Sequence, residues 1–225
     1  MQAVGWLRGE RVRAHVVDSN DGIIATAGVV EGFTGAGASW QVVLAATVAA
    51  MVSGAVALAA ARFGEVATER DAELALVEAE RARLAAGPEE ELAELTDLYV
   101  TKGLPDDLAA QVAVALSTHN ALAAQLDAEY GITEVTAPAV PWRTAVGAFV
   151  AFVLGSSLPL LVVVLAPYRE RAFATFAVVL VALSLTSLVA ARLARTGVRR
   201  VLMRNLAIGS AAMVVSLVAG RLLPV

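Results

Sequence analysis

The chain has 225 residues, of which 58% are hydrophobic and 17% are charged, and its mean hydropathy is +0.71. This composition excludes an ordinary soluble domain and predicts a membrane protein with a handful of spans. The sequence contains no cysteine, which excludes disulfides and thiolate metal sites, so a bound metal would need oxygen, imidazole or thioether ligands.

The formal net charge of −4 conceals two oppositely charged parts. Residues 63–134 hold 16 acidic and 4 basic side chains, a net charge of −12, whereas the rest of the chain holds 5 acidic and 13 basic side chains, a net charge of +8. An acidic polar module is therefore inserted into a basic membrane protein. We expect four parts, which are a cytosolic N-terminal segment (1–17), transmembrane helices 1 and 2 (18–62), an acidic cytosolic helical module (63–137) and transmembrane helices 3 to 5 (138–225).

The first apolar stretch covers residues 23–38. It is short for a bilayer, which needs about 17 to 25 helical residues, so we expect its helix to begin before Asp21. A tight turn at residues 37–39 leads into a second span at residues 40–61. Residues 63–86 are rich in Ala, Glu, Leu and Arg and contain no proline, so they can extend the second span into the cytosol as one long helix.

Two acids accompany the first span. Asp21 lies at its mouth, and Glu31 lies ten residues further inside. An acid at the centre of a membrane helix costs roughly 2.5 to 3.5 kcal/mol on an insertion scale, so such a residue is by default a candidate functional residue. Asp21 can also serve as a helix cap, because an acid followed by Gly and an apolar run is an ordinary helix start. Capping and ion coordination are compatible there, and the two acids suggest a cation path.

The acidic module is expected to be helical. Gly87-Pro88 predicts the end of the long helix, and a second helix is expected at about residues 89–102. Pro105-Asp106-Asp107 predicts the start of a third helix, and residues 120–130 either continue it or form a fourth. Pro138 and Pro141 then mark the return to the membrane.

Three more apolar stretches follow, at residues 142–165, 172–191 and 201–223. The fold class is therefore an all-α membrane protein with five transmembrane helices per subunit and a cytosolic helical module between spans 2 and 3. Most arginines near span ends fall on one side, which the positive-inside rule makes cytoplasmic: Arg8, Arg11, Arg13, Arg143, Arg192, Arg195, Arg199, Arg200 and Arg204. We expect a cytoplasmic N-terminus, an external C-terminus and no cleaved signal peptide, although Arg169 and Arg171 favour the opposite orientation.

Several acids in the module are candidate ligands. Glu91 and Glu94 are three residues apart and face the same way on a helix, and Fe2+ or Mn2+ accepts such carboxylates. Glu65, Glu69 and Glu73 recur every four residues, which is typical of a solvated helix face, and we favour that interpretation over metal binding. A lone helical histidine such as His119 is more often a surface or packing residue than a ligand.

Several segments resemble the vacuolar iron transporter family. They read Asn-Asp-Gly-Ile-Ile at 20–24, Thr-Glu-Arg-Asp-Ala-Glu at 68–73, Leu-Tyr-Val-Thr-Lys-Gly-Leu at 98–104 and Glu-Tyr-Gly-Ile at 129–132, with Gly-Ser-Ser-Leu-Pro-Leu at 155–160 in the third span. Their order and spacing carry a resemblance that covers nearly the whole chain. It implies a transporter that moves Fe2+ or Mn2+ out of the cytosol, apparently in exchange for protons.

The resemblance also implies an architecture and a set of site residues. Members are homodimers of five-helix subunits with the metal path between the subunits and a cytosolic helical module that collects metal. Asp21 matches the first-span aspartate of the family, Glu91 and Glu94 match its metal-collecting Glu-x-x-Glu, and Glu129 matches a further ligand. Lys102, Gln125 and Leu126 stand where some members carry Glu or Met, with Asp106, Asp107, Asp127 and His119 as possible substitutes. No tightly bound cofactor is expected, because Fe2+ or Mn2+ is the substrate.

The second span departs from the family pattern. Members usually read Ser-Met-Ala-x-Gly-Glu-Tyr where this chain has Ala-Leu-Ala-Ala-Ala-Arg-Phe at 57–63, so Leu58 replaces the methionine and Arg62 the glutamate. An arginine on the path would repel a divalent cation unless acids neutralise it. Glu65, one helical turn after Arg62, can pair with it, and Glu31 can replace the lost carboxylate from the opposite helix.

The predicted transport path therefore comprises Asp21, Glu31, Arg62 and Glu65, and the predicted metal ligands are Asp21, Glu31, Glu91, Glu94 and Glu129.

The small residues of the first span offer a face for close helix packing. Gly28 and Gly32 are four residues apart, and this face can form the dimer contact or pack against the second helix. The expected partners are divalent metal ions, protons, the lipid bilayer and a second copy of the chain, with no nucleic acid. The Ala- and Arg-rich composition favours a bacterial plasma membrane.

Alternatives to the transporter remain. The sequence has no Glu-x-x-His repeat and no phosphate-binding loop, so an enzyme is the least supported class. Because Leu58 and Arg62 replace family ligands, the chain could instead be a membrane-anchored metal-binding or regulatory protein that has lost transport, or a transporter of a different cation.

Overall fold

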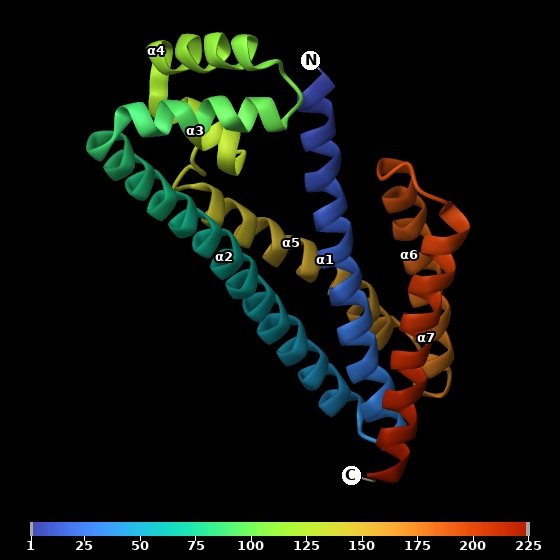
Figure 1. Cartoon of the computed structure of the whole chain (residues 1–225). Coiled ribbons are helices and arrows are strands. Elements are labelled where there is room, and N and C mark those ends of the chain that lie inside the picture. Colours follow the sequence, from blue (N-terminus) through green and yellow to red (C-terminus); the bar gives the residue numbers. More distant parts are fainter. Residues whose placement is uncertain (1, 224–225) are drawn as a thin grey trace. The chain divides into compact units, whose positions relative to one another are not determined.

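The computed structural model describes residues 2–223, without the side chains of residues 2–11 and Tyr168. Within this range the chain forms seven α-helices and one short 3-10 helix, and no strand (Figure 1). The elements are α1 (Gln2–Gly35), α2 (Trp40–Ala86), α3 (Pro88–Thr101), α4 (Asp106–Tyr130), α5 (Val140–Leu165), η1 (Tyr168–Glu170), α6 (Arg171–Leu193) and α7 (Val198–Leu222).

Helix α2 is one continuous helix, as the absence of proline between residues 63 and 86 predicts. It ends at Ala86, where the Gly87 N–H donates to the Arg83 carbonyl oxygen at 2.9 Å. Pro88 then occupies the first turn of α3, a position where its missing N–H removes no helical hydrogen bond. The expected start of α1 before Asp21 is likewise confirmed.

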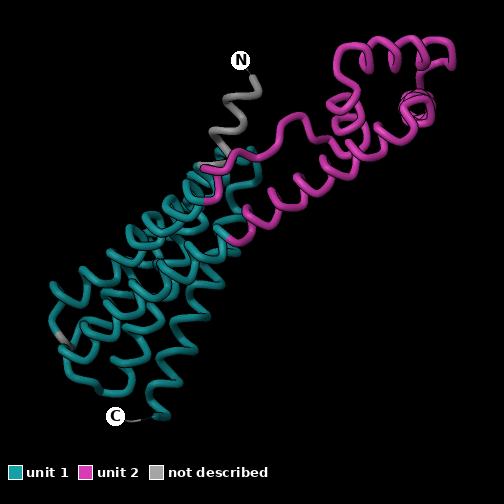
Figure 2. The backbone as a smooth tube through the Cα atoms, turned by 90° about the vertical axis from the view of Figure 1, so that its left-hand side faces the viewer, with its two compact units in different colours: residues 1–63, 142–225 teal, residues 64–141 magenta. Residues whose placement is uncertain are grey.

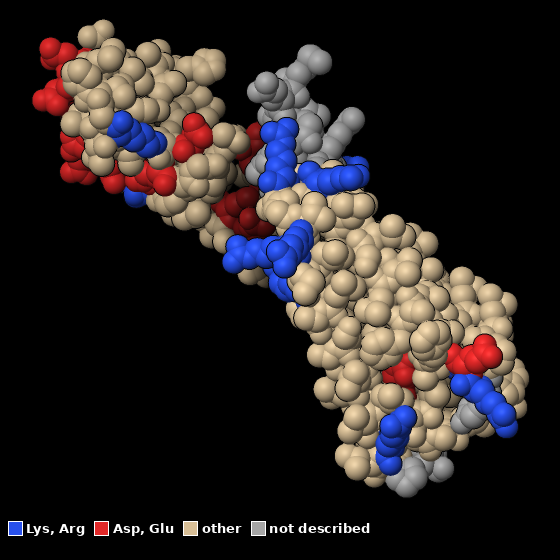
Figure 3. Space-filling view, turned by 90° about the vertical axis from the view of Figure 1, so that its right-hand side faces the viewer, with Lys and Arg blue, Asp and Glu red and all other residues tan. Residues whose placement is uncertain are grey.

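The chain divides into two compact units, coloured separately in Figure 2. Unit 1 comprises residues 1–63 and 142–225, and unit 2 comprises residues 64–141. In Figure 3 acidic side chains gather over the helices of unit 2, whereas much of the surface of unit 1 carries no charge.

Four helices are long and apolar enough to cross a membrane, within the residues described, namely α2, α5, α6 and α7. Helix α1, which holds the expected first span, is not among them. Its acids Asp18, Asp21 and Glu31 stand among glycines and threonines, which lowers its hydropathy. Five spans are therefore not confirmed.

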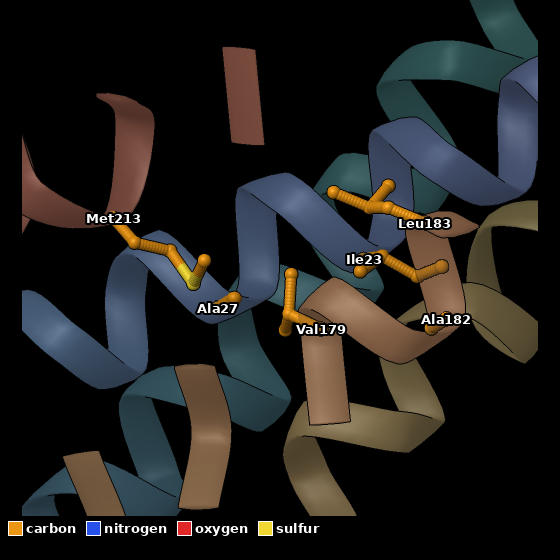
Figure 4. Close-up of a cluster of buried hydrophobic side chains, with 6 residues drawn as sticks. All are labelled: Ile23, Ala27, Val179, Ala182, Leu183 and Met213. Atoms are coloured by element: carbon orange, nitrogen blue, oxygen red, sulfur yellow. The ribbon is translucent and has the colours of Figure 1, made fainter. Parts of the chain in front are cut away.

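The core of unit 1 lies where α1 meets α6 and α7. Ile23 and Ala27 of α1 pack with Val179 and Leu183 of α6 and with Met213 of α7, and all five are essentially inaccessible (Figure 4). The core fixes α1 in the interior of the unit, so a polar side chain on its inner face is removed from solvent.

The small residues of α1 pack against α7. A Cβ atom on Gly28 would lie 3.1 Å from the Ser216 hydroxyl oxygen, and one on Gly220 would lie only 1.9 Å from the Gly32 carbonyl oxygen. This backbone contact requires glycine at position 220. Of the two roles expected for this face, packing against the second helix is wrong, because α7 lies against these glycines in the subunit; the dimer contact stays a prediction.

In unit 2, α3 packs against α4 around Leu95, Ala113 and Ala128. Asn120 has non-helical angles, φ −163° and ψ 95°, and its Oδ1 accepts a hydrogen bond from the Ala123 N–H at 3.1 Å. Asn120 thus caps the second half of α4, so residues 120–130 begin a new helical segment after a kink. Gly131, at φ +68°, closes it in the left-handed conformation that glycine adopts without strain.

Candidate metal-handling sites in the two units

Asp21 lies on the surface of α1 in unit 1. It is exposed, and it lines a cavity of about 1020 Å3 together with Asn20 and the basic residues Arg13, Arg200 and Arg204. The carboxylate is therefore reachable from solvent in one subunit, and the other charged residues of the lining are all basic. The side chains of Arg8 and Arg11, which the orientation argument used, lie outside the described part of the structure.

Glu31 lies further along the same helix and is fully buried. Neither of its carboxylate oxygens has a hydrogen-bond partner among the described residues, and the same holds for the hydroxyl of Thr34, one turn later. A buried carboxylate without a partner carries a large desolvation cost if it is ionised. Ten residues of α-helix rise about 15 Å, so Glu31 and Asp21 of one subunit cannot coordinate the same ion.

Arg62 is neutralised by a residue that the sequence interpretation overlooked. Its Nη2 donates to Asp18 Oδ1 at 2.8 Å, and its Nε donates to the same oxygen at 3.3 Å. The Asp18 side chain is only 3% exposed, whereas the Arg62 side chain is 30% exposed. Neither Glu31 oxygen accepts a hydrogen bond from a described residue, so the expected compensation of Arg62 by Glu31 stays a prediction.

One feature of the sequence points to Asp18 as a residue of the same site. Asp18 and Asp21 are one helical turn apart, so both follow the same side of α1. Only Asp21 drew attention, since it matches a family motif. Glu65, also expected on the path, is exposed and belongs to unit 2.

Unit 2 gathers acids from three helical segments around one arginine. Arg83 of α2 donates through Nη2 to Glu129 Oε2 at 3.0 Å and to the Tyr130 hydroxyl at 2.9 Å, both at the end of α4. The same nitrogen also donates to Glu80 Oε2, one turn earlier on α2. The Glu80 side chain is fully buried, and its second oxygen makes no hydrogen bond to any described residue.

Helix α3 contributes Glu91 and Glu94 to this group. Gln125 of α4 donates through Nε2 to the Glu91 backbone carbonyl and, at 3.5 Å, to Glu91 Oε2. Glu91 and Gln125 are both buried, and Gln125 Oε1 has no partner within residues 2–223. We call Glu80, Arg83, Glu91, Glu94, Gln125, Glu129 and Tyr130 the Arg83 cluster.

The acids of the Arg83 cluster hold protons with different strengths. Burial and the charge of Glu80 raise the pKa of Glu91, and the charge of the neighbouring Glu129 raises the pKa of Glu94. Burial acts to raise the pKa of Glu129 as well, but hydrogen bonds from Tyr130 and Arg83 lower it overall. Protons therefore compete best at Glu91 and Glu94, whereas Glu129 stays ionised.

Other candidate ligands have structural roles or stand apart. Both oxygens of Glu73 accept hydrogen bonds from Thr136, at 2.6 Å from its N–H and 3.0 Å from its hydroxyl, so Glu73 anchors the segment that leaves the module. Glu69 and His119 are exposed. In the described part of the chain, no group of three or more acidic or histidine side chains is arranged to hold a metal ion.

Comparison with known proteins identifies the family. A sequence model of the VIT family matches residues 12–221, which is nearly the whole chain. The chain belongs to the VIT family. A vacuolar iron transporter of Acanthamoeba castellanii is 36% identical over 165 residues, which are 73% of this chain and 58% of that protein. Vacuolar iron transporter 1 of Arabidopsis thaliana is 28% identical over 166 residues, which are 73% of this chain and 66% of that protein. The chain thus spans about three fifths to two thirds of these two relatives.

The candidate metal ligands of this VIT-family chain lie in both units. This VIT-family chain is a membrane protein with several apolar helices, and its acids fall into two sets. Glu91, Glu94 and Glu129 meet in the Arg83 cluster of unit 2, whereas Asp21 and Glu31 stand apart on α1 of unit 1.

Proposed function

We propose that this protein transports a divalent metal cation, Fe2+ or Mn2+, out of the cytosol in exchange for protons. The observation that carries the proposal is the match of residues 12–221 to the VIT family, two relatives of which are named for iron transport. In this proposal α1 is the first of five membrane spans, and unit 2 is a cytosolic module between the second and third spans.

The carboxylates supply the chemistry that such a transporter needs. Hard divalent cations prefer oxygen ligands. Glu91, Glu94 and Glu129 would collect metal in unit 2, and Asp21 would receive it on the membrane path. A proton and a metal ion compete for the same carboxylate, so the raised pKa values of Glu91 and Glu94 support proton exchange.

Glu31 is the proposed inner carboxylate of the path. Unlike the buried Asp18, which pairs with Arg62, Glu31 is buried on α1 with no described partner for either oxygen. A residue of this kind is retained in a membrane helix at a cost, which favours a role in moving ions or protons. Arg62, held by Asp18, and Glu65 would border the path.

We also propose that the protein acts as a homodimer. Asp21 is open to solvent in the single subunit, and a second copy would complete the walls of the path. We further propose a cytoplasmic N-terminus, an external C-terminus and a bacterial plasma membrane as the location. The arginines at the end of α6, in the following turn and at the start of α7 support this orientation.

The second candidate function is metal binding or regulation without transport. One observation favours it. Arg62 stands where the family carries a glutamate, and its positive charge sits in unit 1, paired with Asp18. A transporter of a different cation is also consistent with this substitution.

Flux through reconstituted protein separates these functions. The purified full chain is placed in liposomes, and Mn2+ entry is followed with a trapped indicator. Transport predicts Mn2+ entry that Asp21→Asn abolishes and that Glu170→Gln, a change of an exposed acid in unit 1, leaves unchanged. Mn2+ binding without entry would establish the second function instead.

A further inference from the structure

Arg83 occupies the centre of the acids that are proposed to collect metal. One nitrogen of its guanidinium contacts Glu80 on its own helix and Glu129 and Tyr130 at the end of α4. Four glutamates share this one arginine in the Arg83 cluster, so the group keeps a net formal charge of −3. The guanidinium thus stands where a bound cation would be attracted.

Two buried oxygens of the cluster remain unsatisfied with Arg83 in place. Glu80 Oε1 and Gln125 Oε1 belong to side chains that are 0% and 1% exposed, and neither atom has a hydrogen-bond partner within the described residues. Buried polar oxygens of this kind normally have a partner, because an unpaired one loses its hydrogen bonds to water without replacement. The arginine therefore satisfies only part of the cluster, which retains unused oxygens for a second cation.

We infer that Arg83 is an internal counter-cation of the metal-collecting cluster, and that a divalent metal ion binds by displacing its guanidinium from Glu80 and Glu129. This inference rests on the proposed function, in which Glu91, Glu94 and Glu129 collect metal. Glu80 and Glu129 contact the arginine, and no three of the described acids are arranged around a common point for a metal ion. The structure thus corresponds to the arginine-occupied state of the cluster.

The exchange has a direct consequence for selectivity. A divalent ion gains about twice the Coulomb energy of a monovalent ion at the same distance from a carboxylate. Arg83 carries one charge that is already in place, so a monovalent ion gains little by replacing it. A divalent ion also satisfies the oxygens that the guanidinium leaves unpaired. Arg83 would therefore discriminate against Na+ and K+ and would weaken divalent binding at the same time.

Arg81 offers a matched control. It lies two residues before Arg83 on α2, is 61% exposed, and pairs with Glu78 at 3.0 Å. Arg81→Gln and Arg83→Gln make the same change in net charge and side-chain type, but only the second removes a cation from the cluster. A purely structural role for Arg83 predicts weaker Mn2+ binding in Arg83→Gln, because the carboxylates would lose the residue that holds them together.

The experiment measures Mn2+ binding to the purified full chain in detergent by calorimetry. We expect Arg83→Gln to bind Mn2+ at least about tenfold more tightly than the wild type, Arg81→Gln to match the wild type, and Arg83→Lys to restore weak binding. Equal or weaker binding by Arg83→Gln overturns the inference. If the wild type and all variants fail to bind Mn2+, the proposed collecting role of the acids fails instead.

A second measurement uses the wild type alone, so it does not depend on the folding of a variant. Phenylglyoxal modifies accessible arginines, and mass spectrometry resolves the modified positions. Displacement by Mn2+ predicts faster modification of Arg83 when Mn2+ is added, with no change at Arg81. Slower or unchanged modification of Arg83 at saturating Mn2+ contradicts displacement.

Discussion

The pair between Asp18 and Arg62 gives the sharpest quantitative prediction for unit 1. The shortest distance between its charged atoms is 2.8 Å, and a second hydrogen bond of 3.3 Å reaches the same carboxylate oxygen. At an effective dielectric constant of about 20, unit charges at this separation attract by about 6 kcal/mol before the cost of desolvation. The two partners differ in burial, so their removal has different consequences.

Arg62→Gln leaves the 3%-exposed Asp18 side chain as an unpaired buried charge. We expect a loss of stability of about 3 to 5 kcal/mol, typical of a broken buried ion pair. Asp18→Asn leaves the 30%-exposed Arg62, which can reach water, so we expect a smaller loss of about 1 to 2 kcal/mol. The double variant removes both charges and should recover most of the loss, with a coupling energy of about 2 kcal/mol or more.

The assay is unfolding of the purified chain in mixed micelles by titration with SDS, followed by circular dichroism. The four proteins of the cycle are the wild type, the two single variants and the double variant. Additive losses in the double variant would refute the coupling, and an Asp18→Asn loss larger than that of Arg62→Gln would refute the burial argument.

Four further predictions rest on other features. Glu31→Gln removes a buried, unpartnered charge, so it should leave stability unchanged or raised while abolishing Mn2+ flux in liposomes. Mn2+ affinity should fall about tenfold between pH 7 and pH 5, because Glu91 and Glu94 have raised pKa values and take up protons that exclude the metal. A raised pKa means that the folded protein holds the proton of Glu91 or Glu94 more tightly than the unfolded chain does. This contribution to the stability of the metal-free protein is fully present below the ordinary glutamate pKa, and it is lost as pH rises through the raised pKa values. Glu91→Gln, which cannot ionise, should therefore stabilise the metal-free protein at pH 7. Gly220→Ala should cost about 1 to 3 kcal/mol in SDS unfolding, because the new Cβ would meet the Gly32 carbonyl oxygen at 1.9 Å.

Three of these predictions have a control or an outcome that would contradict them. Glu170→Gln changes an exposed acid and should not affect flux, and normal flux in Glu31→Gln would remove that residue from the path. Mn2+ affinity that is constant from pH 7 to pH 5 would contradict the competition with protons. Gly64→Ala is the control for Gly220→Ala, because a Cβ at position 64 in the middle of α2 meets no atom within 4 Å. It should stabilise the protein by up to about 1 kcal/mol. A Gly220→Ala variant that is stabilised in the same way would contradict the close contact.

Most of the helical architecture follows from local sequence properties. The long helix α2 follows from its composition and from Gly87-Pro88 at its end, and the expected alternatives for α4 are resolved by the kink at Asn120. These features depend on residues that are close in sequence. A membrane span in α1 is harder to recognise, because its acids keep its hydropathy below that of the four apolar helices.

The partners of the charged residues could not be found in this way. Arg62 and Asp18 are 44 residues apart, and Arg83 and Glu129 are 46 residues apart, so neither pair leaves a periodic pattern. Tertiary packing alone brings them together. Asp18, unlike Asp21, belongs to no family motif, and an arginine on an acidic helix face such as Arg83 is ordinarily expected to pair with a neighbour on its own helix.

Proton-coupled Mn2+ movement tests the central claim most directly. Full-length protein is reconstituted in liposomes with an acidic lumen, and lumenal pH and Mn2+ are recorded together. Metal–proton exchange predicts that Mn2+ accumulates inside, that lumenal pH rises in step with it, and that both changes disappear in Asp21→Asn. Mn2+ that binds the protein but does not accumulate, or that accumulates at the same rate without a pH gradient and with no change in lumenal pH, would contradict it.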